Sequence, residues 1–493
     1  MNIDFTKMTA LELAKKIQSG EIKVRQAVDA VYESIDKFDS TYNCYISTCK
    51  EKAYKKADEV QARIDSGNIV SALAGVPVSV KDNICTKGIK TTAASKMLEN
   101  FNPIYNATVV DRMENADMII VGKLNLDEFA MGNTTETSIF GATNNPWDTS
   151  RVPGGSSGGS AVSVAVGEAV ISLGSDTGGS ISQPCSFCGV TGLKPTYGSV
   201  SRHGLIACAS SLDQIGPIAK DVVDCAALFE IISGKDVKDG TSMETPKFDY
   251  SKILDGDAKG KKIGIPSELL GENIDPQIKE AIQNTAKEFE KLGATVEEFS
   301  LPIVKYSVPA YYVIASAEAS SNLSRYDGVK FGYSTPNATD LQDLYIKSRS
   351  EGFGMEVKRR LLLGNLVLSK DYYESYYEKA LQTKRLVQQD LLKALEKYDM
   401  LLAPVAPTTA YKKDEALSSP LDMYMGSFCT VMVNLAGLPA VSVPCGFDNN
   451  NLPIGMQLIG KPFDETSIMQ VAHIFQKTTD FIKTPELIQG VAK

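Results

Sequence analysis

Histidine is scarce in this sequence, and its scarcity limits the catalytic mechanisms open to the chain. The 493 residues contain two histidines, His203 and His473. His473 lies in SIMQVAHIFQKTTD, a helical pattern in which a surface or packing role is expected. His203 is then the remaining candidate for a Ser-His-Asp triad, so a serine nucleophile in this chain is expected to depend on another base.

Surplus positive charge, long apolar runs and a phosphate-binding loop are also missing. The chain carries 51 Lys and Arg against 60 Asp and Glu, with a net charge of −9 and a pI near 5.1. This balance argues against the basic surface of a stand-alone nucleic-acid binder, so any RNA contact is expected mainly through a partner. No apolar run could span a membrane, and the polar N-terminus MNIDFTKMTALELAKK does not resemble a signal peptide, which predicts a cytoplasmic protein. No GxxxxGK[ST] motif is present, so ATP chemistry is not expected in this chain.

The cysteines do not form a recognisable disulfide or metal pattern. There are nine, an odd number scattered along the chain, and we expect them to be reduced core residues. Cys185 and Cys188 form the only CxxC pair, which is a poor zinc site in a chain with two histidines. We interpret the pair as packing and predict no metal site.

Glycine, in contrast, is concentrated in the stretch PGGSSGGSAVSVAVGEAVISLGSDTGGSISQPCSFC, from Pro153 to Cys188. Two Gly-Gly-Ser tripeptides, ending at Ser156 and Ser180, bracket a run from 161 to 173 that is predicted to be a buried helix followed by a strand. Such tripeptides are often structural, because Gly and Ser favour tight turns. They also suit catalysis, because the backbone N–H groups of residues 177 to 180 could converge on an oxyanion beside a serine hydroxyl.

A lysine ends another apolar stretch, AGVPVSVKDN, which is predicted to be a short strand. Lys81 could be a surface residue just beyond the strand, because strand ends meet solvent. It could instead be buried, in which case desolvation lowers the pKa of its ammonium group and allows the neutral amine to act as a base.

The elements alternate along the chain as expected for an α/β protein. Residues 1–67 are predicted to be a helical N-terminal layer without chemistry, residues 68–232 a catalytic core, and residues 233–261 a polar surface excursion. Residues 262–493 complete the sheet and its helical cover, beginning with a strand, helix and strand that imply a parallel βαβ unit. We expect one domain over residues 1–493.

Several motifs together resemble the amidase signature family. They are PGGSSGGS, LGSDTGGSISQP and GVTGLKPTYG, with the flanking segments LDEFAMG, NPWD, SSLDQIGPI and EASSNLSRYDGVKFG. The resemblance spans nearly the whole chain and is far more specific than a lone GxSxG motif. It implies an amidase-signature fold, in which a large mixed β-sheet is covered by helices on both faces.

The resemblance also assigns catalytic roles to matching positions. Ser180 is implied to be the nucleophile, Ser156 a proton relay on a cis peptide bond, and Lys81 the base. The backbone N–H groups of Thr177, Gly178 and Gly179, with that of Ser180, are implied to hold the oxyanion, each donor contributing about 3 kcal/mol where this has been tested. An acyl-enzyme on Ser180 would then be hydrolysed by water.

Within the family, the flanking segments are similar to the ammonia-supplying subunits of tRNA-dependent amidotransferases. This implies that glutamine is the amide donor and that ammonia passes to a tRNA-binding partner subunit, which activates Glu-tRNA(Gln), or Asp-tRNA(Asn), with ATP and Mg²⁺. A small helical subunit is the second implied partner, and no cofactor is expected in this chain. Tyr311 and Arg360 are implied to lie near the glutamine, where an arginine is the natural partner of the α-carboxylate.

Two positions depart from the family pattern. Ser182 stands where the family usually has an arginine, directly after the Ser-Ile of the nucleophile motif. No carboxylate lies between Tyr424 and Asn434, although an aspartate that pairs with the glutamine amino group is expected near Ser427. The missing carboxylate favours one alternative, a free-standing amidase that acts on another small amide. A non-catalytic scaffold subunit is a further alternative, which the presence of all three catalytic side chains and both glycine turns disfavours.

Overall fold

One large β-sheet forms the frame of the protein. The structure is a computed structural model that describes residues 3–415 and 420–486, so the outermost residues of the expected 1–493 domain lie outside the described ranges. The strands are β1 (Tyr45–Thr48), β2 (Pro77–Lys81), β3 (Ile119–Leu124), β4 (Ser172–Asp176), β5 (Thr191–Lys194), β6 (Gln214–Ala219), β7 (Lys262–Pro266), β8 (Thr295–Phe299), β9 (Met400–Pro404), β10 (Ala440–Phe447) and β11 (Pro453–Ile459). In the described residues they form an 11-stranded sheet in the order β1-β3-β2-β4-β6-β5-β10-β11-β9-β7-β8.

The sheet is mixed, as predicted. Strand β2 pairs in parallel with β3 and β4, and β7 pairs in parallel with β8 and β9, whereas the remaining neighbours are antiparallel. Helix α8 (Pro276–Lys291) connects β7 to β8, which confirms the predicted βαβ unit. The α/β class is therefore confirmed.

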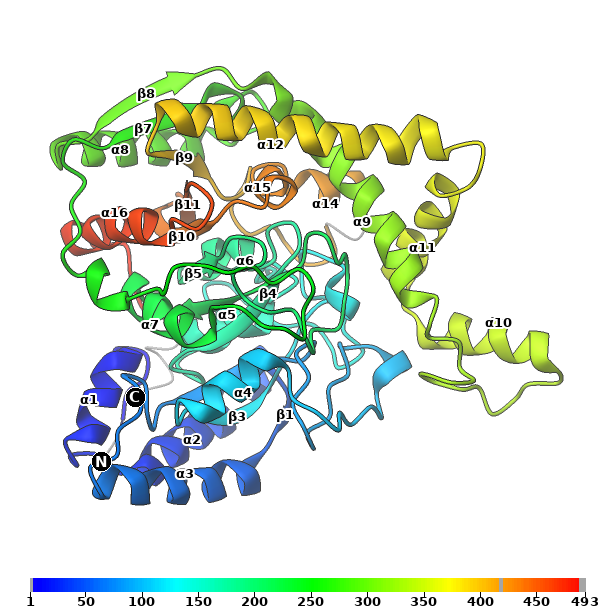
Figure 1. Cartoon of the computed structure of the whole chain (residues 1–493), viewed down its shortest axis with the longest axis horizontal. Helices are drawn as coiled ribbons and strands as arrows, with labels where there is room; N and C mark the ends of the chain where they lie inside the picture. Colours follow the sequence, from blue (N-terminus) through cyan, green and yellow to red (C-terminus); the bar gives the residue numbers. More distant parts are fainter. Residues whose placement is uncertain (1–2, 416–419, 487–493) are drawn as a thin grey trace.

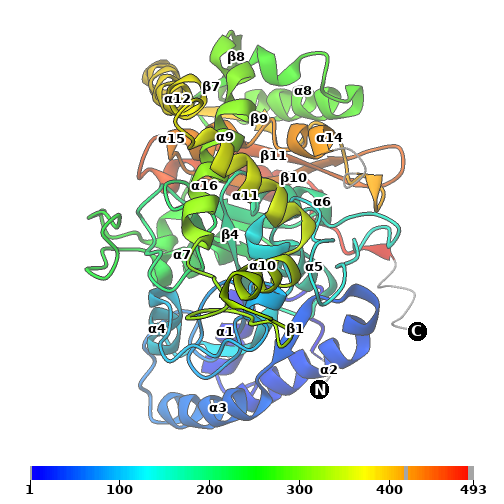
Figure 2. The same ribbon diagram turned by 90° about the vertical axis from the view of Figure 1, so that its right-hand side faces the viewer.

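Helices pack on both faces of the sheet. Helices α5 (Gly158–Val166) and α6 (Ser182–Cys188) lie on one side, and α7 (Val222–Ile232) and α16 (Glu465–Thr478) lie on the other (Figure 1, Figure 2). Strands β2 to β6 are consequently buried along their whole length. This double cover explains how a polar side chain at a strand end can be fully removed from water.

The N-terminal layer contains the predicted helices α1 (Ala10–Gln18), α2 (Val24–Tyr42) and α3 (Lys50–Asp65). Thr9 and Glu12 form the predicted capping box of α1. The prediction of an entirely helical layer was wrong in one respect, because the strand β1 follows α2 and pairs with β3 at the edge of the sheet. Its four residues are too short a run to be recognised from sequence periodicity.

The second half adds a helical cover around the later strands. It comprises α9 (Ser307–Leu323), α10 (Leu341–Gly352), α11 (Met355–Val367), α12 (Lys379–Lys397), α14 (Pro420–Met425) and α15 (Val431–Ala436), while α4 (Thr108–Asn115) belongs to the first half. Helices α10 and α11 project to one side of the molecule (Figure 1). Among the described residues, no helix is long and apolar enough to cross a membrane.

Buried charge is paired close to the end of β2. Lys123 and Asp82 are both fully buried, and Lys123 Nζ lies 3.5 Å from Asp82 Oδ1. The other carboxylate oxygen, Oδ2, accepts hydrogen bonds from the Thr92 N–H (2.8 Å) and hydroxyl (2.6 Å), whereas Oδ1 has no hydrogen bond. Asp82 therefore depends on the charge of Lys123.

We predict that Lys123→Met destabilises the protein by about 3 to 5 kcal/mol, because it leaves a buried carboxylate without its counter-ion. Lys397→Met is the control, since its ion pair with Glu297 is solvent-exposed and should contribute little to stability. Urea unfolding of both variants measures the difference. Equal effects of the two substitutions would show that Asp82 does not depend on Lys123.

Candidate active site

Lys81 is the last residue of β2, and its side chain is fully buried. Strands β3 and β4 flank β2 on both sides, so the amino group is directed into the protein rather than into solvent. The sequence left open whether Lys81 is exposed beyond the strand or buried, and the structure shows that it is buried.

The Lys81 amino group is surrounded by serine oxygens. Its Nζ lies 2.8 Å from Ser156 Oγ, 2.8 Å from Ser157 Oγ and 3.0 Å from Ser175 Oγ, with the Ser175 carbonyl at 3.2 Å. Ser157 donates its own hydroxyl proton to the Ser175 carbonyl (3.0 Å), so it can only accept from Lys81. A neutral amine has two N–H donors and one lone pair. With the donors used on Ser157 and Ser175, the lone pair is available to the hydroxyl proton of Ser156.

Electrostatics favour this neutral amine. Burial lowers the pKa of Lys81 from its ordinary value of 10.5 to about 7, and the nearby carboxylates of Asp127 and Asp176 act in the opposite direction. Near neutral pH a substantial fraction of Lys81 is therefore unprotonated and able to accept a proton.

Ser156 is placed by a tightly packed loop. The peptide bond between Gly155 and Ser156 is cis, as implied by the family resemblance. A Cβ at position 155 would lie 2.2 Å from Asp127 Oδ2, so only glycine fits there. Asp127 is itself held by the N–H groups of Thr134 (3.2 Å) and Thr135 (2.9 Å). This carboxylate thus shapes the loop that presents Ser156 to Lys81.

Ser180 lies on the turn between β4 and α6, beside the Ser156 loop. The N–H of Ser157 donates to the Ser180 carbonyl at 3.2 Å, which joins the two glycine-rich turns. Lys81 and Ser156 are fully buried, whereas 7% of Ser180 remains exposed. Ser180 is thus the member of the three that a substrate can reach first.

Asp176 organises the nucleophile turn. Its carboxylate accepts the N–H groups of Gly179 (2.7 Å) and Ile181 (2.6 Å), and the side-chain amide of Asn434 at 2.8 Å. The N–H of Gly179 is thus engaged with Asp176, which differs from its expected place in an oxyanion hole. The oxyanion roles of Thr177 and Gly178 stay predictions.

Tyr311, in α9, covers the same turn. A Cβ at position 178 would lie 2.4 Å from Tyr311 Cζ, so the phenol ring packs directly on the glycine backbone. The Gly178 carbonyl is fixed from another direction by the hydroxyl of Thr430 (2.7 Å). The predicted proximity of Tyr311 to the reaction centre is consistent with this geometry.

Arg360, in α11, is buried and belongs to an aromatic cluster next to Tyr311. Its Nε donates to Glu356 Oε1 at 2.9 Å, and its guanidinium lies 5.3 Å from the ring centre of Tyr312. The rings of Tyr311 and Tyr312 are 4.9 Å apart, so the cluster connects Arg360 to the nucleophile turn. Its neighbour Arg359 is 40% exposed and also pairs with Glu356.

The two departures from the family pattern occupy different surroundings. Ser182 begins α6 and is buried, with its N–H 3.4 Å from Asp176 Oδ2. Ser427 is half-buried, and its side chain interacts with the hydroxyl of Tyr312. In the described residues around Arg360, Glu356 is the carboxylate that contacts this cluster.

Neither histidine contributes to the site. His203 lies beside Thr108 and the ring of Tyr105, and His473 lies in α16 on the far side of the sheet. The nine cysteines are free, and Cys185 and Cys188 are buried in packing positions as expected.

Sequence reasoning missed several supporting residues, namely Asp127, Ser157, Ser175, Asp176 and Asn434. Asp176 lies within the DTGGS motif, so its position was visible although its role was not. Asn434 reaches Asp176 from 258 residues away, a pairing for which the local sequence gives no signal.

Comparisons with known proteins show what the whole chain is similar to. Residues 26–469 match the family model described as Amidase. The chain is 57% identical to a protein from Agathobacter rectalis that is named as the A subunit of glutamyl-tRNA(Gln) amidotransferase, over 97% of this chain and 95% of the relative. It is 53% identical to the protein of the same name from Lachnoclostridium phytofermentans, over 99% of this chain and the full length of the relative.

Solved structures give the same result. The crystal structure of the A subunit of glutamyl-tRNA(Gln) amidotransferase from Thermotoga maritima is 42% identical, covers 98% of both chains and superposes with a TM-score of 0.80. Peptide amidase from Stenotrophomonas maltophilia is 27% identical, with a TM-score of 0.82 over 98% of this chain and 99% of that enzyme.

We predict that kcat/KM for amide hydrolysis rises with pH through a pKa near 7, because the neutral form of Lys81 is the base. Activity should be lost below this pH as the amine is protonated. Lys81→Met should abolish the activity and, with it, the rise of kcat/KM with pH. Initial rates between about pH 5 and pH 9 measure the profile. Lys194→Met is the control, because Lys194 is also a buried lysine but donates to the Pro195 carbonyl. A profile that is flat across neutral pH would exclude Lys81 as the base.

Proposed function

The chain belongs to the amidase signature family, and on that premise we propose that it is the glutamine-hydrolysing subunit of a tRNA-dependent amidotransferase. Its reaction releases ammonia from the side-chain amide of glutamine. The observation that carries this proposal is the contact of the buried Lys81, whose pKa is lowered to about 7, with Ser156, beside the turn that bears Ser180. The names of the relatives with 53% and 57% identity support the assignment to a tRNA-dependent amidotransferase.

The proposed reaction begins with a proton relay. Ser156 gives its proton to the lone pair of Lys81 and takes the proton of Ser180, whose Oγ attacks the carboxamide carbon. The negative charge that develops on the carboxamide oxygen is stabilised by backbone N–H groups of the turn, for which Thr177 and Gly178 are the proposed donors. Because these donors are held by the fold before the substrate binds, they need no reorganisation during the reaction.

The second half returns the proton. The carbon–nitrogen bond breaks, the proton on Lys81 returns through Ser156 to the leaving nitrogen, and ammonia departs while the glutamyl group stays on Ser180 as an ester. Water then attacks this ester through the same relay, releasing glutamate and restoring the Ser180 hydroxyl. Every proton transfer in this scheme is between side chains of this chain and the substrate or water.

Glutamine is proposed to bind between the nucleophile turn and the Arg360 cluster. Arg360 would pair with the α-carboxylate of glutamine, and Tyr311 would line the path of its side chain. Glu356 is the carboxylate available for the α-amino group, since position 427 is a serine in this chain.

The partners follow from the same proposal. The ammonia would pass to a tRNA-binding subunit that activates Glu-tRNA(Gln) with ATP and Mg²⁺, and Asp-tRNA(Asn) is a second acceptor to be tested. A small helical subunit would complete the complex, which would work in the cytoplasm, where tRNA is charged. The net charge of −9 supports leaving tRNA binding to the partner.

The second candidate function is a free-standing amidase for another small amide. It is favoured by the lack of a carboxylate near Ser427, where an aspartate is expected in the glutamine-hydrolysing subunits. A purely structural subunit is less favoured, because Lys81 and both serines are present and Lys81 already contacts Ser156.

We predict that Ser180→Ala abolishes ammonia release from glutamine by the complex without unfolding the protein, because it removes the attacking oxygen. Ser186→Ala, in the helix that follows, is the matched control and should keep the activity. Ammonia is measured by a coupled assay and folding by thermal melting. Mass spectrometry of the wild-type chain with an electrophilic glutamine analogue should locate the adduct on Ser180. Retained turnover in Ser180→Ala would reject this serine as the nucleophile.

A second substitution separates glutamine from neutral amides. Arg360→Met should lower kcat/KM for glutamine by about 100-fold, mainly through KM, because it removes the partner of the α-carboxylate. Arg359→Met is the control, since Arg359 shares Glu356 but is largely outside the cluster. Hydrolysis of propionamide, which has no carboxylate, should be unchanged in both variants. If the wild-type chain alone hydrolyses propionamide better than the complex hydrolyses glutamine, the free-standing amidase is the correct interpretation.

A further inference from the structure

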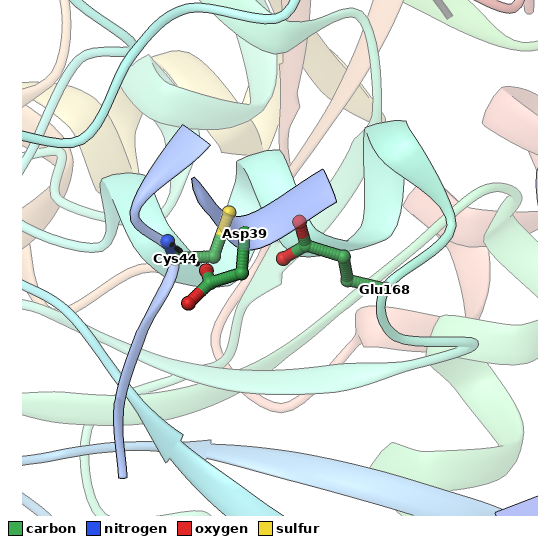
Figure 3. Close-up of side chains that lie close together, drawn as sticks. All are labelled: Asp39, Cys44 and Glu168. Atoms are coloured by element: carbon green, nitrogen blue, oxygen red, sulfur yellow. Dashed lines mark hydrogen bonds between the residues drawn. The ribbon is translucent and has the colours of Figure 1, made fainter. Parts of the chain in front are cut away.

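Three potential metal ligands meet outside the catalytic site. They are Asp39 near the end of α2, Cys44 just before β1, and Glu168 directly after the turn that ends α5. Their side chains lie close together (Figure 3), and one ligand atom from each lies within 4.8 Å of the other two. None of the three takes part in the proposed reaction.

Within the described part of the chain, the carboxylate of Glu168 lacks the hydrogen-bond donors that a buried charge requires. The residue is fully buried, and apart from the weak S–H donor of Cys44, neither carboxylate oxygen has a hydrogen-bond donor among the described residues. An unpaired buried carboxylate is costly, so it requires either a proton or a cation. Burial raises the pKa of Glu168 well above its ordinary value, which shows how costly its uncompensated negative charge would be.

The other two groups are preorganised. Asp39 Oδ1 accepts the N–H groups of Cys44 (2.6 Å) and Tyr45 (3.0 Å), which fixes the carboxylate and leaves its second oxygen for a ligand. The carbonyl of Glu168 accepts the Tyr45 hydroxyl at 2.9 Å, which anchors the opposite side. Cys44 is fully buried, whereas Asp39 is partly exposed and gives an ion a path of entry.

We propose that Asp39, Cys44 and Glu168 bind one divalent metal ion of the zinc class. A thiolate disfavours Mg²⁺ and Ca²⁺, which prefer oxygen ligands, whereas Zn²⁺ accepts sulfur and carboxylate oxygen together. Tetrahedral bonds to Zn²⁺ would place the ligand atoms roughly 3.3 to 3.8 Å apart, so the site needs to contract by about 1 Å. Water supplies the fourth ligand.

The ion would have a structural role. The Cys44 carbonyl accepts the Asn125 N–H at 2.7 Å and lies 2.8 Å from where a Cβ of Gly159 would be, so it packs against the first turn of α5. Glu168 follows the last turn of the same helix. The site would therefore tie α2 and β1 to both ends of α5, the helix that begins two residues after Ser156.

Metal titration of the full-length chain, stripped of metal by chelation, tests the proposal. We expect one equivalent of Co²⁺ to bind and to give a thiolate-to-metal charge-transfer band, which Zn²⁺ should displace. Cys44→Ser should remove the band, and Glu168→Gln should weaken binding on the order of 100-fold. Cys49→Ser is the matched control, because Cys49 is a nearby cysteine outside the cluster and should bind as the wild type does.

The readouts do not depend on amide hydrolysis, so they stand apart from the proposed function. If Glu168→Gln does not fold, the charge-transfer band of the wild-type chain and its loss in Cys44→Ser still decide the question. Absence of the band, or a band that persists in Cys44→Ser, overturns the proposal. Either result would mean that Cys44 does not bind a metal ion in this cluster.

Discussion

Removal of the Lys81 amino group from water is the constraint on which the site depends. Desolvation disfavours the ammonium form, and only this effect makes a lysine a base near neutral pH. The fold achieves it by placing Lys81 at the end of an inner strand with helices on both faces of the sheet. The serine oxygens around Nζ then satisfy the neutral amine without adding charge.

Two buried carboxylates, Asp127 and Asp176, shape the loops of the site and also act against the lowered pKa of Lys81. Asp127 and Asp176 accept backbone N–H groups and so determine the shapes of the loops that carry Ser156 and Ser180. Their negative charges also attract a proton to Lys81, which opposes desolvation. Because backbone hydrogen bonds neutralise part of each carboxylate's field, they moderate this attraction. The same residues thus set the geometry of the serines and the basicity of the lysine.

Much of this could be predicted from sequence because the information was local. The strands β2, β4, β7 and β8 follow from contiguous sequence patterns, whereas the mixed sheet and the roles of Lys81, Ser156 and Ser180 are what the family resemblance implied. The strand β1 was missed because its four residues gain their stability from pairing with β3, which lies far along the chain. For the same reason Asn434 could not be assigned to Asp176, and the burial of Arg360 could not be told from the exposure of Arg359 next to it. Long-range packing decides such cases.

The role proposed for the Arg360 cluster in recognising substrate charge depends on how charge is balanced in a buried site. A buried guanidinium without a counter-ion would be strongly destabilising, so Glu356 has to accompany Arg360 before any substrate binds. An amino acid carries one charge of each sign and therefore adds no net charge to this pair, whereas a carboxylate or an amine alone would leave a charge unbalanced. In a chain with Ser427, the Arg360–Glu356 pair can supply both partners, and this balance favours a zwitterionic amide such as glutamine over a substrate of single charge.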